Sequence, residues 1–77
     1  MPGMKKRLRD QSEKLTRREI EVLYWVAQGR SASEIGRILG ISERTVEVHV
    51  SRAIRKLGAR NRTHAAIIAL REGLIDW

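Results

Sequence analysis

Residues 43–57 contain three arginines that a helix would bring onto a single face. At about 100° per residue, this segment places a basic side opposite an apolar one. The basic side comprises Arg44, Val48, Ser51, Arg52 and Arg55, and the apolar side comprises Val46, Val50, Ala53, Ile54 and Leu57. Guanidinium groups bind phosphates and pair with guanine edges, and a valine among them can cover a thymine methyl group. The pattern predicts a surface for nucleic acid.

The charge of the whole chain points the same way. Its 77 residues carry 16 Lys+Arg against 9 Asp+Glu, a net charge of +7. Residues 42–62 hold six basic and two acidic groups, and such an excess attracts polyanions. Nucleic acid is the first candidate partner and an anionic membrane surface the second, while a role in solubility alone stays open.

Several classes of protein are excluded by what the sequence lacks. There is no cysteine, and the longest apolar run, Val22 to Ala27, is far shorter than the ~20 residues of a membrane span. No glycine-rich phosphate loop occurs, and His49 and His64 stand apart without a metal-binding pattern. We therefore expect no enzyme, metal or cofactor. Because nucleic acid is favoured over a membrane surface as the partner, we expect a cytoplasmic, nucleoid-associated protein that does not bind membranes.

Start and stop signals predict an all-α fold of four helices. Thr16 with Glu19, and Ser31 with Glu34, form capping boxes, and Gly40 lets the chain reverse direction. The predicted helices cover residues 17–28, 32–39, 43–57 and 61 or 62 to about 73. Residues 1–14 are predicted to be a flexible basic arm, and residues 15–77 the folded domain.

Two of these helices carry more apolar surface than one neighbour can cover. The first is apolar nearly all the way round, so it needs more than one partner surface. In the last, residues 65–70 are apolar without a break, and Ala65 and Ala69, four apart, are small enough to admit a second helix. This predicts a weak homodimer that DNA stabilises, through Ala65, Ile68, Ala69 and Leu70.

Hydroxyl groups next to helix starts add candidate phosphate contacts. Ser31 and Ser33 lie at the start of the second predicted helix and Thr45 in the first turn of the third. Exposed amides at such ends bind phosphate. Arg62, at the start of the last helix, is expected to act in the same way.

Taken together, several spaced motifs resemble the LuxR/GerE-type helix-turn-helix domain of bacterial transcription regulators. They include LTRRE at 15–19, LGISERTV at 39–46, KLG at 56–58 and NRT at 61–63. The resemblance covers residues 15–75, and Trp25, Ala53 and the GLI at 73–75 are most similar to the quorum-sensing branch, the acyl-homoserine-lactone receptors. It implies that the third helix recognises DNA in the major groove and that the fourth helps form a dimer.

Carried over from the family, Glu47, Val48 and Ser51 match positions that meet bases. Many relatives have lysine or arginine at the first or the last of these positions, so the target sequence stays open. Glu47 is expected either to accept a hydrogen bond from a cytosine amino group or to pair with Arg44 or Ser51.

The sequence therefore predicts a bacterial, sequence-specific DNA-binding regulator that acts as a homodimer on a palindrome in double-stranded DNA. The alternative is a protein-interaction module that heterodimerises with a full-length LuxR-type regulator and modulates it. Contacts with such a partner or with RNA polymerase stay open, as does the choice between a free-standing regulator and a fragment of a larger receptor.

Overall fold

A computed structural model describes residues 14–76 of the chain. Within them lie four helices and no strand: α2 (Arg17–Ala27), α3 (Ala32–Leu39), α4 (Glu43–Leu57) and α5 (Arg62–Arg71). The all-α prediction is confirmed, and the predicted helix limits agree to within one or two residues. The predicted arm over residues 1–14 lies, except for Lys14, outside the described residues.

Local side-chain contacts explain where the first two helices begin. The Glu19 backbone N–H donates to Thr16 Oγ1 at 3.1 Å, and the Thr16 N–H donates to Glu19 Oε1 at 2.9 Å. Ser31 and Glu34 repeat this arrangement at the start of α3. Each box satisfies two amides that have no partner inside the helix, so both predicted boxes are confirmed.

The turn between α3 and α4 depends on two glycines. Gly40 ends α3 in the left-handed conformation, at φ 73°, which glycine adopts without steric cost. Gly36 is buried inside α3, and its carbonyl accepts from the Ile41 N–H at 2.9 Å. A Cβ at Gly36 would lie 2.7 Å from the Ile41 carbonyl oxygen. The absent side chain therefore lets the turn pack directly onto α3.

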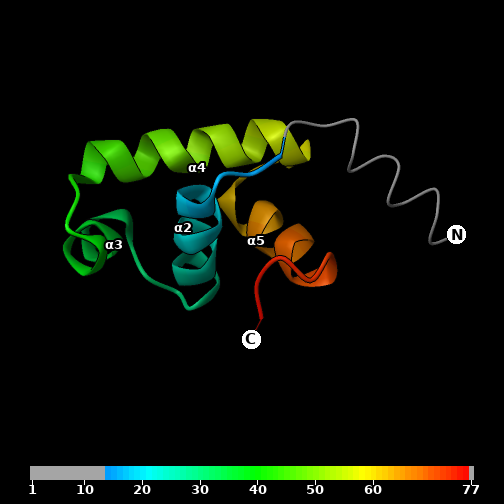
Figure 1. Cartoon of the computed structure of the whole chain (residues 1–77), viewed down its shortest axis with the longest axis horizontal. Helices are drawn as coiled ribbons and strands as arrows, with labels where there is room; N and C mark the ends of the chain where they lie inside the picture. The colour runs from blue at the N-terminus through cyan, green and yellow to red at the C-terminus, as the bar shows by residue number, and fades with distance from the viewer. Residues whose placement is uncertain (1–13, 77) are drawn as a thin grey trace, which may run out of the picture.

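Helix α2 lies at the centre, and α4 runs along one edge of the molecule above the other helices (Figure 1). On one side of α2, Val22 packs with Ile35 of α3 and Val50 of α4. On its other side, Leu23 packs with residues of α4 and α5. The prediction that the first helix needs more than one partner surface is thus confirmed. None of the helices within residues 14–76 is long and apolar enough to cross a membrane.

Helix α5 buries the two small residues that we expected at a dimer contact. Ala65 and Ala69 have no exposed surface and pack in the cluster that contains Leu23. Their small side chains let α5 approach the centre of its own domain, so they are not available to a second protein. Ile68 and Leu70 are half-buried, whereas Ile67 is 45% exposed. The exposed apolar side chain of α5 is therefore Ile67, which was not among the residues predicted to form the dimer contact.

A buried ion pair joins α4 to α2. Lys56 Nζ lies 2.9 Å from Glu19 Oε1, and the two side chains are only 11% and 1% exposed. Burial alone would raise the pKa of Glu19. The hydrogen bond from the Thr16 N–H and the bond and charge of Lys56 outweigh burial and lower this pKa below its ordinary value. The pair fixes the C-terminal half of α4 on the body of the domain.

Candidate nucleic-acid interface

The outer face of α4 carries the residues that helical periodicity assigned to it. Arg44, Val48, Ser51, Arg52 and Arg55 are all exposed. Val46, Val50 and Ala53 on the other side are buried. Because the Ser42 side chain caps the helix start and Gly58 ends it, α4 presents this face over its whole length.

The middle of this face is a shallow depression. It is lined by Arg44, Glu47, Val48, Ser51 and Arg52. Val48 is 39% exposed, so an apolar group lies among cations and a hydroxyl. Such a mixture can bind phosphate at its edges while the valine contacts a thymine methyl group at its centre.

Glu47 has a partner that the sequence did not suggest. Arg62 Nη2 donates to Glu47 Oε1 at 2.6 Å, so the expected pairing with Arg44 or Ser51 is wrong. The two residues lie 15 positions apart, beyond the range of any helical spacing rule. The chain doubles back after α4, so that α5 begins beneath the middle of that helix (Figure 1).

Two of the hydroxyl groups predicted to bind phosphate at helix starts are hydrogen-bonded within the protein. The Thr45 hydroxyl accepts from Ser42 Oγ at 2.9 Å, and the Ser31 hydroxyl accepts from the Glu34 N–H at 3.1 Å. The hydrogen bond from the Ser31 N–H lowers the pKa of Glu34, with help from the charges of Arg30 and Arg37. Ser31 and Ser33 are exposed, so any phosphate at this end must lie beside the Glu34 carboxylate.

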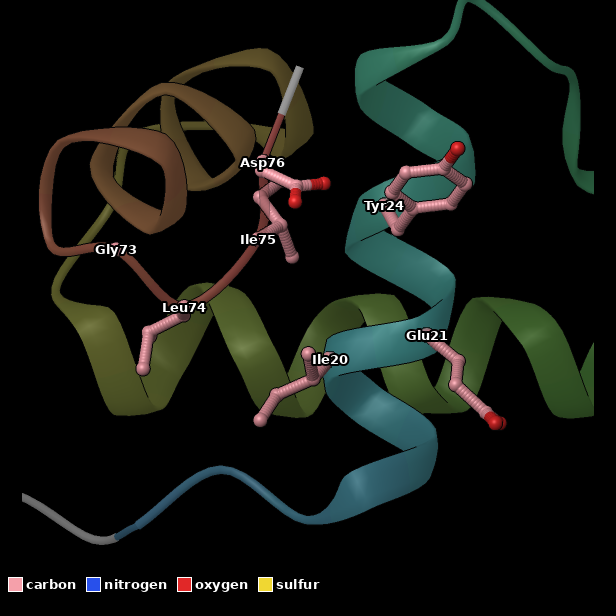
Figure 2. Close-up of a pocket in the computed structure, with 7 residues that line it drawn as sticks. All are labelled: Ile20, Glu21, Tyr24, Gly73, Leu74, Ile75 and Asp76. Carbon is pink, nitrogen blue, oxygen red and sulfur yellow. The ribbon is translucent and has the colours of Figure 1, made fainter.

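A second hollow lies between α2 and the segment that follows α5 (Figure 2). It is lined by Ile20, Glu21, Tyr24, Gly73, Leu74, Ile75 and Asp76. Its charged groups are two carboxylates, Glu21 and Asp76. None of the residues predicted to bind DNA lines this hollow.

The α3–turn–α4 unit, with a basic outer face on its second helix, defines a helix-turn-helix DNA-binding domain. Residues 13–69 match the family model described as "Bacterial regulatory proteins, luxR family". This is most of the folded chain, and the chain belongs to that family. The predicted resemblance is confirmed.

Named relatives and solved structures agree with this assignment. The transcriptional activator protein BjaR1 of Bradyrhizobium diazoefficiens is 55% identical over 84% of this chain and 27% of its own length. The quorum sensing-dependent regulator RpaR of Rhodopseudomonas palustris is 56% identical over 80% of this chain and 26% of its own length. The chain thus spans about a quarter of these relatives. The structure of the transcription factor GerE superposes with a TM-score of 0.77 at 37% identity, covering 83% of this chain and 97% of GerE.

The chain accordingly contains a DNA-binding domain of the LuxR family of transcription regulators. Sequence reasoning found the exposed face of α4 because the helical period is a local property. It missed the Glu47–Arg62 and Glu19–Lys56 pairs, because their members lie 15 and 37 positions apart. In the sequence, the only indication of either pair is that its two members have opposite charges, and many other pairs of residues in the chain share this property.

Proposed function

We propose that residues 15–77 bind DNA sequence-specifically by placing α4 in the major groove, as a homodimer on a palindromic site. The outer face of α4 carries this proposal. It presents three exposed arginines around a half-exposed valine, and the neighbouring carboxylate, Glu47, is held by Arg62. A recognition helix needs this combination, because cations hold the phosphates while short side chains reach the base edges.

The proposed contacts divide into two groups. Val48 and Ser51 lie at the centre of the face and are proposed to meet bases. The groups proposed to hold the DNA backbone are Arg44, Thr45, Arg52 and Arg55 of α4, together with Ser31 and Ser33 at the start of α3 and Arg62 at the start of α5. RpaR is named as a quorum sensing-dependent regulator, and we extend that role to this chain as part of the proposal.

The first expected result is a steep salt dependence of DNA binding. If a dimer neutralises about six to ten phosphates, log K against log[salt] should have a slope of about −5 to −9. In Arg52→Ala, each protomer loses one cation, so the slope should become shallower by about 1 per protomer if Arg52 contacts phosphate. Fluorescence anisotropy with a labelled duplex at four salt concentrations measures both quantities.

Arg71→Ala is the matched control, because Arg71 is exposed at the end of α5 that points away from α4 (Figure 1). It removes the same charge but should leave the slope within the error of the measurement. An affinity that does not change with salt, or an equal loss in both variants, would contradict the assignment of α4 as the DNA surface.

The proposed dimer uses the exposed side of α5. Ile67 is 45% exposed and Ile68, beside it, is half-buried. One short helix buries well under the ~1,200 Å² of a stable interface, so the free dimer should be weak, and DNA with two half-sites one turn apart should assemble it. VqmA of Vibrio cholerae, whose structure is 38% identical, is described as a dimer that changes conformation without target DNA, and this supports the proposal.

Ile67→Glu tests the dimer. Because the side chain is exposed, helix content and unfolding temperature should stay within a few degrees of wild type, while cooperative binding to a palindrome is lost. Binding to a single half-site should be retained. Ala69→Glu is the contrasting variant, since it places a charge in the core and should unfold the domain. If Ile67→Glu still bound the palindrome cooperatively, this part of α5 would not be at the dimer interface. That result would favour the alternative of a protein-interaction module.

A further inference from the structure

The Glu47–Arg62 pair joins the recognition helix to the first residue of α5. Its N–O distance is 2.6 Å, and the side chains of Arg62 and Glu47 are 42% and 44% exposed. An ion pair so exposed contributes little to folding, so stability does not explain it. The pair instead lies at the edge of the depression that the α4 arginines surround, because Glu47 also lines that depression.

The geometry sets limits on what each member can do. One Glu47 oxygen already accepts from Arg62, so a cytosine amino group would have to share that oxygen with the guanidinium or use the other one. An arginine carries five N–H donors, and Glu47 holds Arg62 through Nη2. The remaining donors of this half-exposed side chain can meet a phosphate while Glu47 keeps the guanidinium in place.

We propose that Glu47 is a positioning residue for DNA binding, which holds Arg62 against the α4 surface while Arg62 compensates the Glu47 charge. This inference rests on the proposed function, because it assumes that phosphates approach α4. Without Arg62, an uncompensated carboxylate lies at the edge of the DNA-facing surface and repels the phosphates. With Arg62, the pair presents guanidinium N–H groups and no net negative charge.

The proposal predicts strongly non-additive effects in a double-mutant cycle, measured with wild type, Glu47→Gln, Arg62→Gln and the double variant. We expect Glu47→Gln to change affinity by less than about threefold and Arg62→Gln to lower it by about tenfold or more. The double variant should regain part of that loss, because the uncompensated carboxylate is gone although the contact of Arg62 with phosphate is not restored. Arg62→Lys, which keeps the charge, should bind better than Arg62→Gln.

Three further measurements separate positioning from other roles. The coupling should shrink as salt rises, since both charges are exposed and screened. Unfolding temperatures without DNA should agree among the four proteins, which a structural role would not allow. Selection from random duplexes should return the same half-site for wild type and Glu47→Gln, whereas a base-reading Glu47 would change it.

Arg60→Gln is the matched control. Arg60 is exposed in the turn just before α5, and its combination with Glu47→Gln should be additive. The positioning role would be overturned if the effects of Glu47→Gln and Arg62→Gln on affinity were additive, or if Glu47→Gln selected a different half-site. The proposed function would stand in either case. A wild-type chain that binds no duplex at low salt would instead overturn the proposed function itself.

Discussion

Lys56→Met should destabilise the domain by about 3–5 kcal/mol at neutral pH. The substitution preserves most of the packing volume but leaves the Glu19 carboxylate, 1% exposed, without its cation. A folded unit of this size has a total stability of about 3–9 kcal/mol. The variant should therefore be partly or wholly unfolded at room temperature, as urea denaturation followed by circular dichroism would measure.

The double variant Glu19→Gln/Lys56→Met is the control. It removes both charges and keeps a side chain that can accept from the Thr16 N–H, so it should recover most of the lost stability. A single variant as stable as wild type would show that Glu19 is not held by Lys56.

The response to pH provides a second check on the same pair. Because the pKa of folded Glu19 lies below its ordinary value, ionised Glu19 stabilises the wild type at neutral pH. This contribution is lost as pH falls from about 4.3, the ordinary value, through the folded pKa. In Lys56→Met, the buried Glu19 carboxylate no longer has Lys56 to stabilise its charge, so protonation in acid costs this variant less stability than it costs wild type. The difference in unfolding free energy between the two proteins should therefore narrow as the pH falls.

Gly36→Ala should destabilise the domain by about 1–3 kcal/mol, although the same change in an exposed helix stabilises by about 1 kcal/mol. The new Cβ would lie 2.7 Å from the Ile41 carbonyl oxygen, which is backbone and cannot rotate away. This clash can be relieved only if the turn between α3 and α4 moves, and the first residues of α4 would move with it. DNA affinity should therefore fall even where the domain remains folded.

Arg37→Ala controls for the effect of alanine in the same helix. Arg37 follows Gly36 directly and is exposed, so its replacement should change stability by less than about 0.5 kcal/mol. Urea denaturation compares the two variants. Equal stability of Gly36→Ala and wild type would mean that the turn adjusts without cost.

The sequence by itself determined the helices and the outward face of α4. Thr16 and Ser31 mark helix starts because the groups that they bond lie three residues away, and such contacts form whatever the rest of the chain does. The 3.6-residue period likewise assigned Arg44, Val48 and Arg52 to one side. Local bonding and helical geometry are sufficient for these features, and the family resemblance rests on the same residues.

Only the tertiary structure decided which face of α5 is buried and which charges are paired. An unbroken apolar run over residues 65–70 has no periodicity, so nothing local distinguishes Ala69 from Ile67. The approach of α5 to α2 does, because only small side chains fit that contact. The partners of Glu47 and Glu19 were likewise set by helix crossings, which bring together charges 15 and 37 positions apart. Sequence spacing carries no information at that range, since the distance between two helices depends on how the whole core packs.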